Sequence, residues 1–232
     1  MYKGLKIKPP FFEIGPKAYL YGEKMLKLAQ VIDKVAIKYD LDVIVTPQYT
    51  DIKLLADNTE RILVFAQHMD YLPVGRGLGS VLPEAVKAAG AVGVMLNHAE
   101  KPLTMAEIER TIERADEVGL GTIVCANTVE DVKAIAKMSP NLIVAEPTDL
   151  IGTGQTSDSN YVIETIKTVR EINPDIMVLQ GAGISNGQDV YNTIKLGAQA
   201  TGSTSGIIKA IDPYAMVEEM LSNLRRAWDE MQ

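Results

Sequence analysis

The chain has 232 residues and a formal net charge of −7, with 47% hydrophobic and 23% charged residues. This composition suits a globular chain with a sizeable core, and the acidic balance without any basic cluster argues against a nucleic-acid partner. No apolar run reaches the roughly 18 residues of a membrane span, and the N-terminus lacks the apolar stretch of a signal peptide. Cys125 is the single cysteine. It rules out an internal disulfide, reads as a buried strand thiol rather than a nucleophile, and fits a cytoplasmic protein without membrane association.

Short apolar runs alternate with amphipathic stretches eight times along the chain. The predicted strands are 11–14, 42–46, 62–66, 92–96, 121–125, 142–145, 176–180 and 198–202. The predicted helices are 23–38, 51–57, one from 83, one from 104, 129–138, 158–172, 188–196 and 213–228. Thr104 with Glu107 three residues on indicates a capping box at a helix start.

The strand runs are apolar throughout rather than alternating, which is typical of parallel strands covered on both faces. Each strand, helix and pair of connections has the length of a βα unit. Eight such units without a linker predict one domain over residues 1–232, with an α/β fold that is a closed (β/α)8 barrel. A doubly wound open sheet stays the alternative, because periodicity alone does not show closure.

The rest of the chain is organised around residues 142–155, LIVAEPTDLIGTGQ. Glu146 is the first charge after a buried apolar run, and a loop with glycines and hydroxyls follows it. In an α/β barrel, a carboxylate at the carboxyl end of a strand lies where the chemistry is done. The alternative interpretation is a surface acid at the end of a strand.

Other strand ends supply complementary groups. Lys17 follows the first strand and His98 the fourth, while GAGIS (181–185) and GSTSG (202–206) follow the seventh and eighth. Loops of small residues that lead into helix N-termini favour an anion, and the last two βα loops often hold a phosphate. The alternatives are a solvated lysine, a structural histidine and tight turns that only close βα units.

These groups together suggest a proton shuttle beside a phosphate. A carboxylate would remove a proton next to a carbonyl, and an imidazole and an ammonium group would stabilise the enediolate. The other histidine, His68, is interpreted as structural or interface-forming, with no partner that we can name. The histidines and acids show no metal-ligand spacing, so we expect neither a metal nor a cofactor. No motif suggests a covalent mechanism.

The sequence resembles the triosephosphate isomerase family in its shorter archaeal-type form. The resemblance runs from GPKAY (15–19) to SGIIKAIDP (205–213), and rests most on VFAQHMD (64–70), VLPEAVKAAGAVGVMLNHAE (81–100), VAEPTDLIGTG (144–154) and GAGISNGQDV (181–190). It implies a TIM barrel, a small phosphorylated sugar as substrate, a place in glycolysis and gluconeogenesis, and a homo-oligomer. Family members are dimers or tetramers, and the shortened second and third helices favour the tetramer.

The resemblance also implies a role for particular residues. Glu146 matches the general base, His98 the electrophile, Lys17 the substrate-binding lysine and Glu100 the acid just beyond the histidine, while residues 147–154 match a lid that closes over the site. The residues that match the phosphate-binding positions are Ile151, Gly152, Gly183, Ser185, Thr204 and Ser205.

Three positions depart from the family pattern. Gly15 stands in the substrate-binding position where the family has an asparagine, so the amide is missing. Ala99 stands where a serine commonly follows the histidine, and the loop after the eighth strand is polar over Thr201–Thr204. We therefore expect triosephosphate isomerase activity, and keep two alternatives. One is a related aldose–ketose isomerase for another small sugar phosphate, such as a tetrulose phosphate. The other is a phosphate-binding barrel of low activity.

Overall fold

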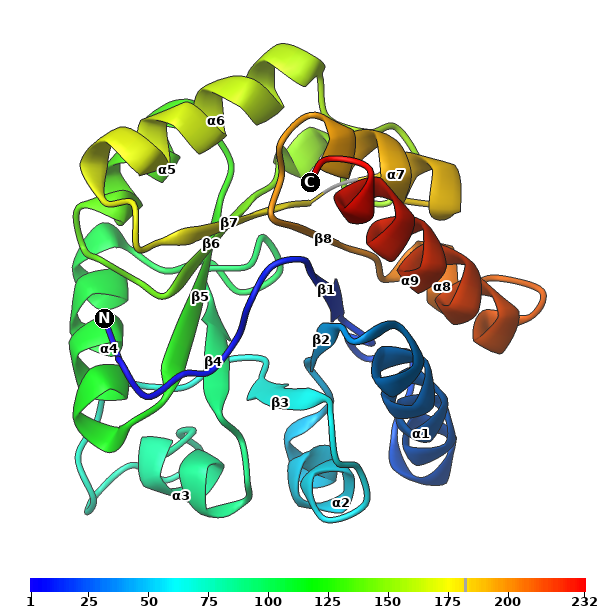
Figure 1. The fold of residues 1–232 in the computed structure, drawn as a ribbon. Helices are drawn as coiled ribbons and strands as arrows, with labels where there is room; N and C mark the ends of the chain where they lie inside the picture. The colour runs from blue at the N-terminus through cyan, green and yellow to red at the C-terminus, as the bar shows by residue number, and fades with distance from the viewer. Residues whose placement is uncertain (182) are drawn as a thin grey trace.

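The computed structural model describes every residue except Ala182. Within the described part, parallel strands close into a barrel in chain order, and β1 is hydrogen-bonded to both β2 and β8. Figure 1 shows the helices arranged around the outside of the strands. The strands are β1 (Phe11–Ile14), β2 (Asp42–Val45), β3 (Leu63–Ala66), β4 (Gly93–Leu96), β5 (Gly121–Ala126), β6 (Leu142–Ala145), β7 (Met177–Gln180) and β8 (Ala200–Gly202). The predicted closed barrel is confirmed, and the open-sheet alternative is wrong.

The helices follow the predicted order, with ends close to the predicted ones. They are α1 (Gly22–Tyr39), α2 (Ile52–Ala56), α3 (Pro83–Ala88), α4 (Met105–Val118), α5 (Val129–Ala136), α6 (Ser159–Ile172), α7 (Gly187–Lys195), α8 (Ser205–Ile208) and α9 (Pro213–Asp229). The structure adds two 3-10 turns, η1 (Tyr49–Asp51) and η2 (Thr148–Leu150), and the helix α8. The prediction missed all three, because elements of three or four residues are too short to show a period.

Capping boxes fix the starts of α4 and α5. The Thr104 hydroxyl accepts a hydrogen bond from the backbone N–H of Glu107, whose carboxylate accepts from the N–H of Thr104, so the predicted capping box is confirmed. Thr128 and Asp131 make the same reciprocal pair at the start of α5. Each box satisfies two backbone donors that a helix start leaves without partners.

The apolar core forms two layers. The outer layer lies between the strands and the helices. The inner layer fills the barrel and includes Phe11, Ile44, Phe65, Ile123, Cys125, Leu142, Val144, Leu179 and Ala200. Because side chains alternate along a strand, the residue two positions after an inner-layer residue also faces the barrel interior. Phe11 is followed in this way by Glu13, and Val144 by Glu146. The expectation that the strands are apolar throughout is therefore wrong at β1, where Glu13 is buried.

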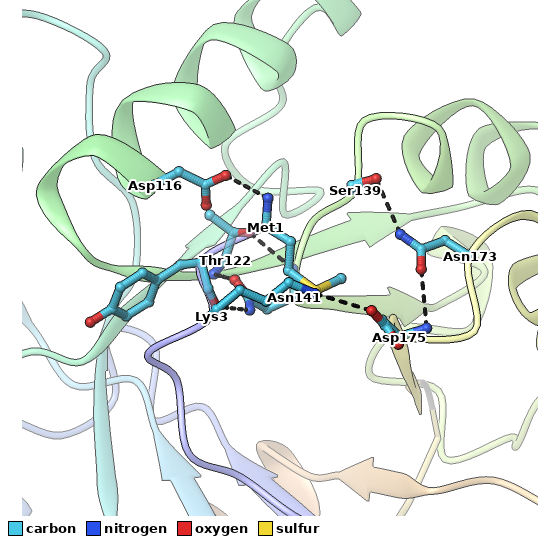
Figure 2. Close-up of polar contacts among 9 residues, drawn as sticks. Met1, Lys3, Asp116, Thr122, Ser139, Asn141, Asn173 and Asp175 are labelled. Carbon is cyan, nitrogen blue, oxygen red and sulfur yellow. Dashed lines mark hydrogen bonds and ion pairs between the residues drawn. The ribbon is translucent and has the colours of Figure 1, made fainter.

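The first residues of the chain cross the amino ends of the strands. In Figure 1 this blue segment runs from beside α4 to β1. Asn141, at the start of β6, accepts a hydrogen bond on its side-chain oxygen from the N–H of Thr122 (3.1 Å), and the Thr122 hydroxyl accepts one from the N–H of Asn141 (3.2 Å). The Asn141 amide also donates to the carbonyl of Tyr2 (2.8 Å), and Lys3 pairs with Asp175 (Figure 2). This end of the barrel is closed by paired polar groups.

Candidate active site

A pocket of about 480 Å³ lies at the carboxyl ends of the strands. It brings together nearly all the residues that the sequence singled out, from five different βα loops. The predicted residues that line it are Gly15, Lys17, His98, Glu100, Glu146, Ile151, Gly152, Gly183, Thr204 and Ser205. The remaining candidate, Ser185, is not among its lining residues.

Lys17 is held in an unusual backbone conformation at the edge of this pocket. Its φ of 47° lies in the left-handed region that non-glycine residues rarely adopt. The side-chain amides of Gln48 and Gln67 donate hydrogen bonds to its carbonyl oxygen at 2.8 and 3.0 Å. The Lys17 side chain is 21% exposed, and its Nζ lies 2.7 Å from Oε1 of Glu100. The solvated-lysine alternative therefore does not describe this residue, and the strained backbone is of the kind that clusters at functional sites.

His98 follows β4, and its surroundings favour the neutral form of its imidazole ring. Burial, and then the charge of Lys17, hold its pKa below the usual value, against an opposing contribution from Glu100. The backbone N–H of Glu100 donates to Nδ1 of His98 at 3.0 Å. A nitrogen that accepts a hydrogen bond carries no proton, so in the neutral ring the proton sits on Nε2. His98 therefore offers the pocket an N–H donor at neutral pH.

Asn97 anchors the loop that carries this histidine. Its side-chain amide donates to the carbonyl of Cys125 (2.9 Å), and its side-chain oxygen accepts from the N–H of Leu103 (2.9 Å). Asn97 itself has a φ of 57°, a conformation that asparagine tolerates better than most residues. The loop is tied to β5 and to the approach to α4, which fixes where His98 and Glu100 lie.

Glu146 enters the pocket from the end of β6. Its backbone N–H donates to the carbonyl of Ala126 (2.9 Å), which continues the pairing of β6 with β5 by one residue. The strand geometry is thus maintained up to Glu146, and its side chain follows Val144 on the face that points into the barrel. The surface-acid interpretation does not fit this position.

The segment after Glu146 reaches across to the loop after β7. The N–H of Thr148 donates to the side chain of Asn127 (2.8 Å) at one end of this segment. At the other end, a Cβ on Gly183 would lie 1.9 Å from the carbonyl oxygen of Gln155, and the φ of Gly183 is 71°. Only glycine fits this close approach. The candidate lid and the β7 loop are therefore in contact at the pocket wall.

The loops after β7 and β8 form one wall of small residues. The hydroxyl of Ser203 donates to the carbonyl of Ile184 (2.7 Å) and ties the two loops together. Ser185 differs from its neighbours, because its N–H and its hydroxyl both donate to the carboxylate of Asp189, at 3.0 and 2.8 Å. Sequence reasoning missed Lys209, which also lines the pocket and places its ammonium 5.5 Å from the centre of the Tyr19 ring.

Glu13 is another pocket residue that sequence reasoning missed. Its side chain is buried, and the hydroxyl of Thr46 donates to its Oε1 at 3.1 Å. The pKa of this carboxyl is raised to about 8: burial is the main cause and the charge of Glu146 adds to it, while the Thr46 hydrogen bond and the charge of Lys17 oppose the shift. A signal was available in the sequence, because one carboxylate interrupts the apolar run FFEI.

His68 also lines the pocket, after β3. Its Nε2 lies 3.3 Å from Oδ1 of Asp70, so the expectation that it has no partner to name is wrong. Asp70 in turn accepts a hydrogen bond from the N–H of Val81 (2.7 Å), which holds the loop between them. This arrangement agrees with the structural role that we expected for His68.

Comparisons with known proteins identify this combination of barrel and pocket. A sequence model described as triosephosphate isomerase matches residues 16–218. The triosephosphate isomerase of Methanobacterium bryantii is 40% identical, with 93% of this chain and 97% of that protein covered. The chain belongs to the triosephosphate isomerase family. The enzyme of the same name from Sulfurisphaera tokodaii is 37% identical, with 96% of this chain and 99% of that protein covered.

A solved structure supports the fold. The crystal structure of the triosephosphate isomerase from Bartonella henselae superposes with a TM-score of 0.76 at 15% identity, and covers 96% of this chain and 100% of that one. The family match begins at residue 16, so Glu13 and Gly15 lie outside it. Among the residues that the structure describes, no group of three His, Cys, Asp or Glu side chains is placed to hold a metal ion, and no helix is long and apolar enough to cross a membrane.

Proposed function

We propose that the chain is an aldose–ketose isomerase that interconverts glyceraldehyde 3-phosphate and dihydroxyacetone phosphate without a cofactor. The observation that carries the proposal is the meeting of Glu146, His98 and Lys17 in one pocket, in a chain of this family. The reaction moves one proton between neighbouring carbons, so it needs a base, a donor for the carbonyl oxygen and a grip on the phosphate.

Glu146 acts as the base in this proposal. Its carboxylate removes a proton from the carbon next to the carbonyl, which leaves an enediolate, and then returns the proton to the neighbouring carbon. The Nε2–H of neutral His98 donates a hydrogen bond to the oxygen on which negative charge develops. Two features support this role: the low pKa of His98, and the backbone N–H that occupies its Nδ1.

Lys17 supplies positive charge next to these groups. Its ammonium is paired with Glu100, and the hydrogen bond from Lys17, more than its charge, holds the pKa of Glu100 below the usual value. An anionic substrate in the pocket would also be attracted by the Lys17 ammonium group. The substrate-binding residues in this proposal are Gly15, Lys17, Ile151, Gly152, Gly183, Ser185, Thr204 and Ser205.

The phosphate is expected at the wall of small residues after β6, β7 and β8. Ile151, Gly152 and Gly183 come together there with Thr204 and Ser205. Lys209 adds a cation at the same wall. Ser185 joins this set only if its N–H and hydroxyl leave Asp189, so we expect a smaller contribution from it than from Thr204 and Ser205.

A related isomerase for another small sugar phosphate, such as a tetrulose phosphate, is the second candidate. The observation that favours it is at β1, where Gly15 offers no side chain and Glu13 brings a carboxyl group into the pocket. A phosphate-binding barrel of low activity is disfavoured, because a binding protein has no need of Glu146, His98 and Lys17 together.

The test is the rate of triose phosphate isomerisation by the purified protein, coupled to a dehydrogenase, beside the same assay with a tetrulose phosphate. We expect a kcat/KM for glyceraldehyde 3-phosphate that approaches the diffusion limit of about 10⁸ M⁻¹s⁻¹. A value lower by several orders of magnitude, with faster turnover of the tetrulose phosphate, would favour the second candidate. No turnover of either sugar, with tight binding of inorganic phosphate, would favour the binding protein.

A homo-oligomer, either dimer or tetramer, and a cytoplasmic location stay predictions from the family. Sedimentation equilibrium of the purified protein measures the first directly. A monomer with full isomerase activity would show that the pocket is complete within one chain.

A further inference from the structure

Glu13 reaches the pocket because of its place on β1. Phe11 faces the inside of the barrel, so Glu13, two residues later and nearer the carboxyl end, points the same way. Its neighbours across the sheet are Ile44 on β2 and Gly202 on β8. The side chain therefore extends from the inner layer of the core into the pocket, which Glu146 and Lys17 also line.

Two glycines leave the room that this carboxyl group occupies. A Cβ on Gly15 would lie 3.0 Å from Oε1 of Glu13, and a Cβ on Gly202 would lie 3.0 Å from Oε2. Longer side chains at either position would displace the carboxyl group. The absence of a side chain at Gly15 and the carboxyl group of Glu13 thus go together, because the carboxyl group occupies the space that a side chain at position 15 would need.

The surroundings of Glu13 favour its neutral form. The titratable groups that interact electrostatically with Glu13 are Glu146 just after β6, Lys17 after β1 and Cys125 on β5. The adjacent strands present Thr46 and Gly202, which carry no charge. The Thr46 hydroxyl satisfies one oxygen, so a proton on the carboxyl group is available for a second hydrogen bond.

We propose that Glu13 is a substrate-contacting residue of this isomerase site, and that its carboxyl group, lying between Gly15 and Gly202, makes the hydrogen bond from β1 to the oxygens of the reacting carbons. This inference rests on the proposed isomerase function. Gly15 has no side chain to make such a bond, and Glu13 fills the space beside it. An O–H donor stabilises the negative charge of the enediolate, whereas an ionised Glu13 would repel both that charge and Glu146.

The first experiment compares Glu13→Ala and Glu13→Gln with the unmodified protein in the triose phosphate assay. We expect Glu13→Ala to lower kcat about 100-fold, the loss typical of one donor to a developing oxyanion. KM should change little, because the phosphate wall lies on other loops. Glu13→Gln keeps a neutral donor of the same length, so we expect it to recover most of the loss at neutral pH.

The pH profile separates a contact with substrate from a purely structural role. Ionisation of Glu13 near its pKa of about 8 removes the donor, so kcat/KM of the unmodified protein, which reports the free enzyme, should fall as the pH rises through that value. Glu13→Gln has no proton to lose there and should keep its rate across the same range. A structural role would change the unfolding temperature without moving this alkaline limb.

Asp33→Asn is the matched control. Asp33 is 8% exposed, as Glu13 is, but it lies on α1 and accepts hydrogen bonds from the N–H groups of Arg61 and Ile62 at 2.7 and 2.9 Å. We expect this variant to lower the unfolding temperature and to leave the pH profile of kcat/KM unchanged. Equal kcat and an unmoved alkaline limb in both Glu13 variants would overturn the proposal.

A second readout separates this inference from the proposed function. In protein with isotope-labelled glutamate carboxyls, the signal missing from Glu13→Gln identifies Glu13 by NMR. Saturating dihydroxyacetone phosphate should move that signal and its titration midpoint. No isomerisation together with a moved signal would end the proposed function and keep Glu13 as a ligand contact. An unmoved signal would overturn the Glu13 inference, whatever the activity.

Discussion

Glu13 and Asp33 are two carboxyl groups of equal burial at opposite ends of the barrel. Asp33 accepts hydrogen bonds from the backbone N–H groups of Glu60, Arg61 and Ile62, just before β3 begins. Glu13, at the carboxyl ends of the strands, accepts from the Thr46 hydroxyl and lies near the charge of Glu146. Backbone N–H donors hold the Asp33 side chain in place, whereas burial and then the charge of Glu146 raise the pKa of Glu13. The same side-chain chemistry is therefore used for structure at one end and left open to react at the other.

Other polar residues at the two ends of the barrel show the same difference between structural pairing and readiness for a ligand. At the amino ends of the strands, Asn141 and Thr122 satisfy each other, as Figure 2 shows. At the carboxyl ends, His98 keeps one ring nitrogen for the pocket, and Lys17 sits in a strained backbone conformation. Paired polar groups add stability, whereas groups kept ready for a ligand cost some. Substitutions at the two ends should therefore separate loss of activity from loss of stability.

The largest expected effect is at Glu146. We expect Glu146→Gln to lower kcat by about a thousandfold or more, because the base is gone. Glu146→Asp keeps a carboxylate but draws it back by one methylene, and should still lose about a hundredfold. Steady-state kinetics and thermal unfolding measure both effects, and the unfolding temperature should change little. Glu164→Gln, on the exposed side of α6, is the control and should keep full activity. An unchanged rate in Glu146→Asp would contradict the proposed mechanism.

The sequence predicted most of the site at the carboxyl ends of the strands, and its successes share one feature. Glu146, His98 and Lys17 each come within three residues of the end of an apolar run, and in a βα repeat the carboxyl ends of all strands meet at one face. The barrel order and the strand positions followed from the same eightfold alternation. Helix starts such as Thr104 were predictable because their capping residues are three positions apart in the sequence.

What the sequence did not predict depends on how side chains meet in space, both between distant segments and within loops. Glu13 lies inside an apolar run, and only the approach of Gly202 and Thr46 gives it a pocket to face. Ser185 lies in a loop with the composition of a phosphate-binding loop, but its N–H and hydroxyl both donate to the carboxylate of Asp189, four residues later. The partner of His68 lies only two residues on, and it was missed because a loop has no period that fixes which side chains meet.

At the other end of the barrel, we expect Asn141→Ala to lower the free energy of unfolding by about 2–3 kcal/mol, since it leaves the N–H of Thr122 and the carbonyl of Tyr2 without their partners. The kcat should stay unchanged, because the site lies at the opposite ends of the strands. Urea unfolding and the isomerase assay measure the two effects. Asn173→Ala is the control and should cost less, because the Asn173 side chain is hydrogen-bonded to the partly buried Ser139 hydroxyl and to the N–H of the exposed Asp175. A loss of kcat in Asn141→Ala without a loss of stability would contradict the division between the two ends.

A smaller loss of stability is expected from the capping box of α4. Thr104→Ala removes the acceptor for the N–H of Glu107 and should cost about 1 kcal/mol. Thr104→Ser keeps the hydroxyl and should recover most of that loss in the same urea titration. α4 lies outside the barrel between β4 and β5, so kcat should not change. A Thr104→Ala protein with lowered kcat would mean that the start of α4 also positions the His98 loop, which Asn97 ties to Leu103.

The smallest effect tests how the site keeps His98 neutral. Lys17 lowers the pKa of His98 and Glu100 raises it, so Glu100→Gln should lower that pKa further. The chain has two histidines, so their NMR signals can be followed separately as the pH falls. We expect the His98 midpoint below the ordinary value in the unmodified protein, and lower still in Glu100→Gln. Asp70→Asn, beside His68, is the control and should leave the His98 midpoint unchanged. A higher His98 midpoint in Glu100→Gln would mean that Glu100 acts on the ring mainly by positioning Lys17 toward it, and that the positive charge beside His98 is lost with its partner.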